Sequence, residues 1–262
     1  MNQNIFQVKS FINYWLDAVD EHSLHSPFFY NFYTNVLRKK STQPDLISLK
    51  QVRKNFESDT RVIEVNDLGA GSKHHPKSSR KINEIARTSV TPEKYSILYA
   101  NIIQHFLYKN ILELGTSLGV NTLYLSKARE DTSIITFEGS SEIAKVARNL
   151  FDTSNTRNIN IIEGSIDEIL PQYLSSPEEI DFALMDANHR YEPTLRYFDY
   201  LTKKIHDNSM IILDDIHYSS EMEEAWKVIQ KHELVYATAD LFRCGLVFFN
   251  PSLNKQNVVL QF

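Results

Sequence analysis

The feature that most constrains the fold is a regular alternation of apolar runs and amphipathic stretches in the second half of the chain. Apolar runs of strand length occur near residues 111–114, 133–138, 159–162, 180–185 and 209–213, and an amphipathic stretch lies between each pair. Parallel neighbours in a sheet need a crossover connection, which is usually a helix. The alternation therefore predicts an α/β protein with a doubly wound, parallel sheet.

The end of the chain departs from this alternation. Two apolar runs, Leu234-Val-Tyr-Ala-Thr and Gly245-Leu-Val-Phe-Phe, are joined by a short polar segment that leaves no room for a crossover helix. They predict an antiparallel hairpin at the close of the sheet. The expected fold class is therefore a Rossmann-like, mostly parallel, seven-stranded sheet with a closing antiparallel hairpin and an N-terminal helical extension.

The N-terminal helices are expected from two local patterns. Apolar residues recur at three- and four-residue steps from Ile5 to Val19, as on one face of a helix. Ser26 and Pro27 are typical of the N-cap and first turn of a second helix, which runs to about Leu37. Helical spacing also explains most of the large aromatic residues, so these are interpreted as packing residues rather than a substrate platform: Trp15, Phe28, Phe29, Tyr30, Phe32 and Trp226.

The region that follows is the hardest to place. Residues 41–61 are polar and weakly patterned, and the loop Asp67–Lys77 is rich in glycine, serine and basic residues. A flexible exposed connection is favoured for this loop over a lid that meets an anionic substrate group. Residues 1–90 are thus expected to be a helical extension or cap with a mobile loop, and residues 91–262 to be the main ligand-binding domain.

Size and charge narrow the class of partner. The chain has 262 residues, 42% of them hydrophobic, which is enough for one large core or a core with a small appendage. A formal net charge of -5 gives no overall reason to expect nucleic acid or an anionic membrane as partner. The single cysteine, the lack of a leader-like N-terminus and the lack of a membrane-length apolar run are typical of a cytoplasmic protein. We expect a soluble cytoplasmic protein that acts on a small molecule.

Glycine placement points to a cofactor site. Four of the seven glycines, Gly115, Gly119, Gly139 and Gly164, lie just past the ends of three successive expected strands. Such turns free backbone N–H groups to face a nucleotide-type ligand. We therefore expect the ligand at this edge of the sheet.

Two segments compete for the cofactor loop, and the residues that follow decide between them. Both the run before Gly71 and the run before Gly115 are apolar and carry an acid. Only the second is followed by a helix and a further apolar strand, which ends in Glu138 about two dozen residues after Gly115. A carboxylate at that position is suited to accept hydrogen bonds from a ribose diol. Glu138 is therefore predicted to bind ribose.

The loop lacks the signatures of other nucleotide-binding proteins. Its Gly115-x-x-x-Gly119 spacing is not the Gly-x-Gly-x-x-Gly dinucleotide fingerprint, and the chain has no phosphate-binding Gly-x-x-x-x-Gly-Lys-Ser/Thr segment. These absences disfavour dehydrogenases and nucleotidases.

The segment instead resembles the first motif of the class I S-adenosylmethionine-dependent methyltransferases, Glu-x-Gly-x-x-x-Gly, with its acidic ribose ligand on the next strand. Within that superfamily, Thr91-Pro-Glu before a helix and then Ile-Leu-Glu-Leu-Gly-Thr-Ser-Leu-Gly-Val-Asn-Thr looks like the catechol and caffeoyl-CoA type of O-methyltransferase, over roughly 90–249. The resemblance implies that residues 91–262 form an S-adenosylmethionine-binding domain. The cofactor-binding residues that match its motifs are Glu113, Gly115, Thr116, Ser117, Gly119 and Glu138.

Further cofactor residues follow from the same resemblance. Ser165 and Ile166 resemble the family's third motif, whose small polar residue and neighbouring apolar side chain border the adenine. Gly139 is the turn glycine beside the ribose ligand. Asp186 ends the next strand, at the edge where ligands of open α/β sheets bind.

Asp186 and His189 are the predicted catalytic residues. In the catechol-type relatives, the aspartate at this position binds a divalent metal, and a lysine three positions later is the general base. Here the third position is His189, and an imidazole can accept a hydroxyl proton near neutral pH. Histidine also ligates metals, so both roles stay open for it.

A metal site is the least determined expectation. Asp186, Asp214 and Asp215 together would offer hard oxygen ligands for Mg²⁺. Acids at these positions equally serve metal-free methyltransferases, where they position substrate or begin the next helix. Mg²⁺ is therefore left open as a second cofactor beside S-adenosylmethionine.

The sequence as a whole predicts S-adenosylmethionine-dependent O-methylation of a small hydroxylated acceptor. An NAD(P)-dependent oxidoreductase on a Rossmann-type sheet is the first alternative, although it lacks the third glycine. The second is a non-catalytic scaffold that keeps the cofactor pocket. The acceptor's identity and a homodimeric state are left open.

Overall fold

The computed structural model describes residues 3–40, 44–65, 78–176 and 178–262, so the predicted loop Asp67–Lys77 lies outside the described residues. The chain divides into two compact units. A central unit comprises Lys39–Tyr173, and a terminal unit comprises Met1–Arg38 with Leu174–Phe262. The predicted boundary after residue 90 separates a helical cap from a ligand-binding domain, which is a division by function and not by compact units. It stays a prediction.

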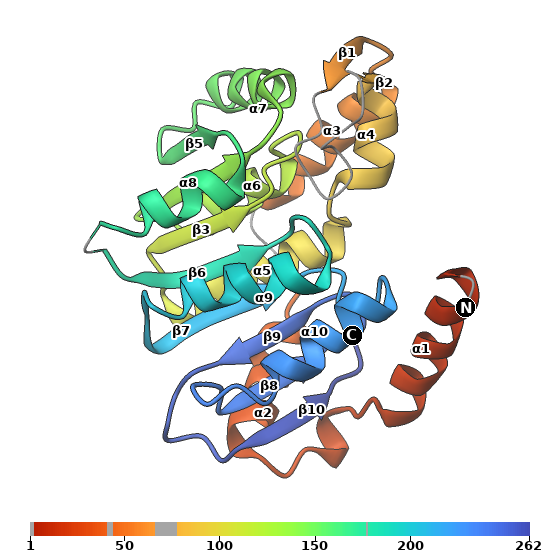
Figure 1. Ribbon diagram of the computed structural model, residues 1–262, viewed down its shortest axis with the longest axis vertical. Helices are drawn as coiled ribbons and strands as arrows, with labels where there is room; N and C mark the ends of the chain where they lie inside the picture. Colours follow the sequence, from red (N-terminus) through yellow and green to blue (C-terminus); the bar gives the residue numbers. More distant parts are fainter. Residues whose placement is uncertain (1–2, 41–43, 66–77, 177) are drawn as a thin grey trace. The chain divides into compact units, whose positions relative to one another are not determined.

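Three parallel strands form the sheet of the central unit, in the order β3, β4, β5. β3 (Asn110–Leu114), β4 (Ser133–Glu138) and β5 (Ile159–Glu163) match the three runs predicted there (Figure 1). The register aligns their carboxyl ends, since Leu114 lies opposite Phe137, and Glu138 lies opposite Glu163. The predicted cofactor segments therefore leave the sheet at one edge.

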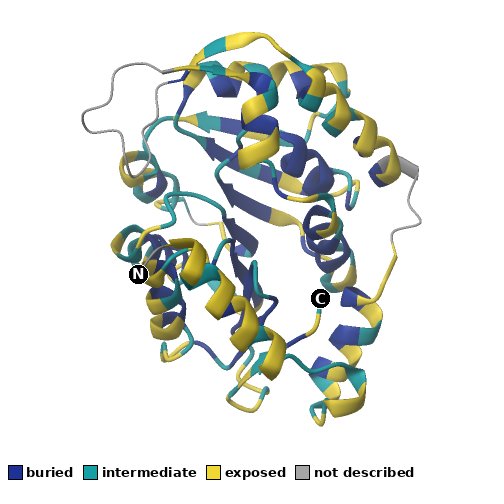
Figure 2. Cartoon of the chain, turned by 90° about the vertical axis from the view of Figure 1, so that its right-hand side faces the viewer, coloured by how far each residue is buried: buried dark blue, intermediate teal, exposed yellow. Residues whose placement is uncertain are grey.

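Helices supply the crossovers of this unit. α6 packs on β4 and on α3 and α5, and α7 packs on β4 and β5. A separate antiparallel ribbon, β1 (Val62–Val65) with β2 (Ser78–Lys81), contacts α7 through β1. Figure 2 shows buried strands and helices with one exposed face, as their apolar periodicity predicts. The helices are α3 (Pro44–Ser58), α4 (Ile82–Ser89), α5 (Glu93–Phe106), α6 (Val120–Ser126), α7 (Ser141–Thr153) and α8 (Ile166–Tyr173).

α3 is a helix that the sequence pattern did not predict. Its buried apolar residues are few, with Leu46, Leu49 and Phe56 all at most 9% exposed. They lie three and seven positions apart, which places them on one narrow stripe of a helix. Charged and polar residues around this stripe hide the period, so the segment reads as weakly patterned.

The terminal unit holds the remaining five strands in the order β6, β7, β9, β8, β10. β6 and β7 are parallel, while β9 is antiparallel to both β7 and β8, which confirms the closing hairpin. β10 pairs parallel with β8, and the described sheet strands therefore number eight rather than the predicted seven. The sequence pattern did not predict β10, because this strand is only partly buried and has no apolar run. The strands are β6 (Ile180–Met185), β7 (Ile205–Leu213), β8 (Ala237–Asp240), β9 (Gly245–Phe248) and β10 (Gln256–Val259).

Two predicted N-terminal helices are confirmed. α1 spans Gln3–Asp17 and α2 spans Pro27–Phe32, with Ser26 as the N-cap. A π-helical turn, Tyr33–Leu37, extends α2 to the predicted end. Beyond them the unit holds the short 3-10 turn Glu21–Ser23 and the helices α9 (Tyr191–Leu201) and α10 (Ser220–Ile229), which pack on each other. None of the described helices has the length and apolarity that crossing a bilayer requires.

The packing interpretation of Trp15 and Tyr30 is wrong, because their exposed fractions are 67% and 50%. α1 is held mainly by polar contacts, and the ring of Phe11 also packs edge-on against Phe242 at 5.1 Å between centroids. Gln7 donates to the carbonyl of Tyr218 at 3.0 Å, and the hydroxyl of Tyr14 donates to the carbonyl of Leu260 at 2.7 Å. The apolar face of α1 remains exposed in the chain: Ile5, Val8, Phe11, Ile12, Trp15 and Leu16.

Candidate functional site

The loop after β3 is held in a conformation that suits backbone recognition. Gly115, Ser117 and Gly119 have φ values of 105°, 49° and 79°. The N–H groups of Gly115 and Thr116 both donate to the carbonyl of Phe137, at 3.0 Å each. The first turn of the loop is thus fixed to the end of β4. The positive φ values at Gly115, Ser117 and Gly119 make a tight turn, which lets a ligand approach the backbone closely.

Gly119 can only be glycine in this packing. It precedes α6 with a left-handed backbone, and its N–H donates to the carbonyl of Thr116 at 3.0 Å. A Cβ atom there would lie 2.7 Å from a ring carbon of Phe151 and 3.1 Å from the Cβ of Ala147. The loop therefore passes unusually close to α7 as it enters α6.

Glu138 joins two loops through its carboxylate. Oε2 accepts from the N–H of Ser117 and Oε1 from the N–H of Ser140, each at 2.9 Å. The residue is only partly buried, and Gly139 beside it is also partly exposed. The predicted ribose ligand thus lies at the end of β4 against the glycine loop.

The third predicted segment is tied to the second. The N–H of Gly164 donates to the carbonyl of Glu138 at 3.0 Å, and Gly164 has a φ of 135°. The carbonyl of Ser165 then accepts from the N–H groups of Glu168 and Ile169, which starts α8 at Ile166. The central unit therefore brings together the ends of β3, β4 and β5, where the predicted cofactor residues other than Asp186 lie.

Glu113 is placed differently from the other predicted cofactor residues. Its carboxylate is completely buried and accepts hydrogen bonds from Asn121 at 2.8 Å, Thr122 at 2.5 Å and Thr136 at 2.7 Å. Burial raises the pKa of this carboxyl to about 7, although the three hydrogen bonds oppose the shift. This geometry favours support of the loop from β3 over direct contact with a cofactor.

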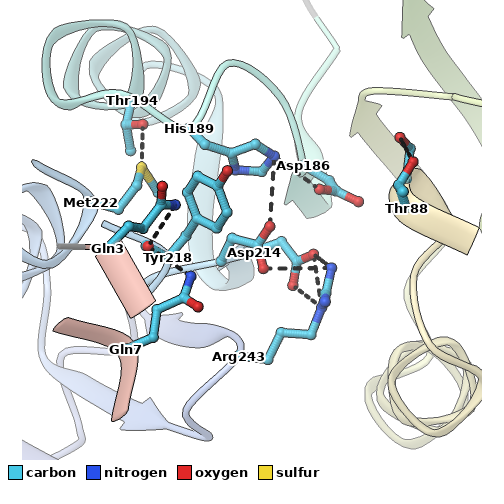
Figure 3. A network of polar contacts seen from close by, with 12 residues as sticks. Gln3, Gln7, Thr88, Asp186, His189, Thr194, Asp214, Tyr218, Met222 and Arg243 are labelled. Atoms are coloured by element: carbon cyan, nitrogen blue, oxygen red, sulfur yellow. Dashed lines mark hydrogen bonds and ion pairs between the residues drawn. The ribbon is translucent and has the colours of Figure 1, made fainter. Parts of the chain in front are cut away.

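Asp186 and His189 face each other after β6 in the terminal unit. The Nε2 atom of His189 lies 3.5 Å from Oδ1 of Asp186, and the two side chains are 29% and 17% exposed (Figure 3). The turn between them is strained, with φ values of 67° at Asn188 and 24° at His189. Asn188 is anchored by a 3.0 Å hydrogen bond to the hydroxyl of Tyr197. Backbone strain held by such anchoring is common at active sites.

An arginine that the sequence reasoning missed completes this region. The Nε atom of Arg243 lies 3.1 Å from each carboxylate oxygen of Asp214, and Nη2 lies 2.7 Å from Oδ2 (Figure 3). Nη2 is also 3.6 Å from Oδ1 of Asp215, whose Oδ2 lies 4.0 Å from Nε2 of His189. Arg243 lies in the β8–β9 hairpin, nearly thirty residues after the two aspartates. Local sequence spacing therefore could not predict their contact.

The pKa values of Asp215 and Arg243 are shifted by burial and by the charges of neighbouring side chains. Burial and the neighbouring Asp214 raise the pKa of Asp215, while Arg243 and His189 act in the opposite direction. Burial opposes the charge of Arg243, but the two aspartates outweigh it and raise the arginine's pKa further. The guanidinium is therefore permanently charged.

The expected metal ligands do not fit a divalent cation as placed. Asp214 is completely buried, and both of its oxygens are hydrogen-bonded to Arg243. Within the described ranges, no group of three or more histidine, cysteine, aspartate or glutamate side chains is arranged to hold a metal ion. A cation that used Asp214 would have to displace the guanidinium.

α1 contacts the chain beside His189. Gln3 and Gln7 both reach the carbonyl of Tyr218, at 3.5 Å and 3.0 Å, and the Tyr218 ring centroid lies 6.3 Å from that of His189 (Figure 3). Sequence reasoning did not assign Tyr218 to the site. Its ring is 46% exposed, which leaves an aromatic surface next to the imidazole.

Comparisons with known proteins agree with this fold. Residues 112–216 match the family described as "Methyltransferase domain". A catechol O-methyltransferase of Niastella koreensis is 30% identical over 133 residues, which cover 49% of this chain and 58% of that protein. The alignment thus spans little more than half the length of that relative.

Solved structures extend the similarity over more of the chain. An SAH-bound methyltransferase of Podospora anserina superposes with a TM-score of 0.60 at 12% identity, over 87% of this chain and 97% of that one. An O-methyltransferase of Bacillus cereus in complex with SAH gives 0.54 at 18% identity, over 83% and 96%. At these identities the structures establish the fold.

Residues 112–216 thus match a methyltransferase domain, and the fold is the one that these solved methyltransferase structures share. The similar proteins include a catechol O-methyltransferase and a caffeoyl-CoA O-methyltransferase, the type that the motif at Glu113–Gly119 resembles.

Proposed function

We propose that this protein is an S-adenosylmethionine-dependent methyltransferase that transfers a methyl group to an oxygen of a small hydroxylated acceptor. The observation that carries the proposal is the carboxylate of Glu138, which joins the backbone of the glycine loop at Ser117 to the next loop at Ser140. An acid so placed, at the end of the second strand and beside a left-handed glycine loop, suits a nucleoside with a free ribose diol.

The cofactor residues divide the recognition of that ligand. The loop from Gly115 to Gly119 lets the ligand approach its backbone closely, Glu138 with Gly139 accepts the ribose hydroxyls, and Ser165 with Ile166 borders the base. Glu113 supports the loop from beneath through Asn121 and Thr122 of α6. These four parts all belong to the central unit.

Transfer needs a base for the acceptor proton. S-adenosylmethionine supplies a methyl group on a positively charged sulfur. As the acceptor oxygen forms its bond to that carbon, the carbon–sulfur bond breaks and the hydroxyl proton passes to Nε2 of His189. Asp186, 3.5 Å away, orients the imidazole and stabilises its protonated form. Alignment of oxygen, carbon and sulfur supplies much of the rate.

The remaining properties follow from the sequence rather than from the site. A net charge of -5 supports a small acceptor rather than a nucleic acid or an anionic membrane. The single cysteine supports a cytoplasmic location.

Calorimetric titration of the purified protein with S-adenosylhomocysteine tests the cofactor class. We expect one site with a dissociation constant in the micromolar range. NADH titrated under the same conditions is the control for the oxidoreductase alternative, and it should give no heat of binding. If NADH binds and S-adenosylhomocysteine does not, the methyltransferase proposal is wrong.

A further inference from the structure

We propose that the guanidinium of Arg243 takes the place of a divalent cation among Asp186, Asp214 and Asp215, so that the enzyme works without a metal ion. This inference rests on the proposed function, because it concerns how the acceptor is handled during methyl transfer. Its test measures metal binding directly and does not need turnover.

The first argument is the commitment of Asp214 to Arg243. A divalent ion binds carboxylate oxygens at about 2.0–2.6 Å, and it needs those oxygens to point into an open space. Both oxygens of Asp214 instead face the guanidinium at 2.7 to 3.1 Å, and the aspartate is 0% exposed. A cation at this carboxylate would stand against a permanent positive charge.

The second argument is that Arg243 also serves Asp215. Its Nη2 lies 3.6 Å from Oδ1 of Asp215, and Nε2 of His189 lies 4.0 Å from the other oxygen. Asp215 thus lies between two nitrogen-bearing side chains. The positive charge that a metal ion would bring to this carboxylate is already present in the chain.

The third argument is that backbone hydrogen bonds hold Arg243 beside Asp214 and Asp215. The carbonyl of Arg243 accepts from the N–H of Ile216 at 3.1 Å, which ties the β8–β9 hairpin to the segment that carries the two aspartates. Phe242, with a φ of 66°, packs its ring on His217 at 5.5 Å between centroids. The N–H of Arg243 also donates to the carbonyl of Leu241 at 2.8 Å. The arginine is therefore held at the aspartates by its own turn.

This arrangement has a consequence for the acceptor. A bound divalent cation with open positions orients an acceptor by coordinating its oxygens, and two adjacent oxygens fit it best. A guanidinium committed to Asp214 offers no coordination shell. The acceptor therefore needs one reacting hydroxyl whose proton His189 accepts, and it does not need a neighbouring hydroxyl as a chelating partner.

Titration of the wild-type protein with Mn²⁺, followed by electron paramagnetic resonance, tests the proposal. Mn²⁺ is suited to an oxygen-rich site and its free form gives a strong signal. We expect no saturable binding up to about 1 mM, a weak limit for any protein site, with or without S-adenosylhomocysteine. A micromolar site that Asp214→Asn abolishes would overturn the proposal. Calorimetry with S-adenosylhomocysteine reports separately on the proposed function.

An arginine variant gives the converse test. Arg243→Gln keeps a polar side chain but removes the charge, so it should release Asp214 and Asp215 and increase Mn²⁺ affinity at least tenfold. Arg148→Gln is the matched control, since Arg148 pairs with Glu163 at 2.7 Å on the central unit and should leave Mn²⁺ affinity unchanged. A folded Arg243→Gln protein that gains no Mn²⁺ binding would contradict the proposal. If circular dichroism shows that the variant does not fold, the wild-type titration decides.

Discussion

The imidazole of His189 lies 3.5 Å from the carboxylate of Asp186, and this pair has a close counterpart at the opposite end of the parallel strands β6 and β7. There, Nε2 of His206 lies 2.9 Å from Oδ1 of Asp181. Both histidine side chains are 29% exposed. The two pairs therefore share residue type and exposure but differ in which end of the strands they occupy, and ligands of such sheets bind at the carboxyl ends.

His189→Ala should lower the turnover number, because it removes the proposed base. General-base catalysis typically contributes about 10²–10⁴-fold. Turnover is measured as S-adenosylhomocysteine release with any accepted acceptor, and cofactor affinity by calorimetry. His206→Ala is the control and should keep wild-type turnover. Equal losses in the two variants would mean that His189 acts through stability and not through chemistry.

Glu138→Ala should weaken S-adenosylhomocysteine binding by tenfold or more, because two hydrogen bonds to a ribose diol are each worth about 1 kcal/mol or more. Calorimetry measures the affinity. Asp131→Ala is the matched control, since Asp131 is an exposed acid just before the opposite end of β4 and pairs with Arg129. Unchanged affinity in Glu138→Ala would remove this residue from the ribose site.

Gly119→Ala should destabilise the protein by about 2–5 kcal/mol, the sum of a left-handed alanine and an overpacked contact. The new Cβ would lie 2.7 Å from Phe151, so the double variant Gly119→Ala with Phe151→Leu should recover part of the loss. Denaturant unfolding measures both. If Gly119→Ala alone unfolds at the wild-type midpoint, the close approach of the loop to α7 is wrong.

Glu113 should make stability fall as pH rises. Its folded-state pKa of about 7 lies above the ordinary value of 4.5, so the folded state binds the proton more tightly and loses stability between these two pH values. At 1.36 kcal/mol per pKa unit the loss is about 3 kcal/mol. Glu113→Gln cannot titrate, so its free energy of unfolding relative to wild type should increase from pH 4.5 to pH 7. A constant difference would contradict this assignment.

His217 should have a linkage of the same sign as Glu113, because its folded-state pKa is also raised. Burial opposes its charge, but Asp240 at 2.8 Å, together with Glu223, outweighs burial and raises its pKa above the ordinary 6.5. Its contribution to stability is therefore complete below pH 6.5 and is lost as pH rises through the raised value. The thermal midpoint of His217→Asn should lie below wild type at pH 6 and approach it at alkaline pH. A gap that stays constant between pH 6 and alkaline pH would contradict this assignment.

Hydrophobic periodicity predicted the helices and strands that bury one whole face or all of their side chains. The strands of the alternating region are buried, and the helices between them bury one face. Apolar composition and spacing therefore predict both kinds of element. α3 and β10 escaped prediction for one shared reason. Each buries too few apolar side chains to set up a period, and each is held by neighbours that are distant in sequence.

The same reasoning explains the error on α1. Its apolar residues repeat with helical spacing, and the helix formed as expected. The hydrogen bonds that hold it are made by Gln7, Ser10 and Tyr14, which lie on a different face. Of the exposed apolar residues of α1, Phe11 alone has a ring contact outside the helix, with Phe242, among the described residues. Helical spacing predicts the helix and its apolar face, but it does not show which face of the helix contacts the rest of the protein.

By itself, the sequence determined the fold class and predicted the cofactor edge, because both depend on local patterns: apolar runs of strand length, the turn glycines Gly115 and Gly119, and the strand-end acid Glu138. Tertiary structure alone decided the charge environment of Asp214. Arg243 reaches it from a hairpin far along the chain, and a contact between distant residues leaves no trace in local spacing. Burial then fixed the consequence, since a carboxylate removed from water must be paired, and the partner it has is a guanidinium.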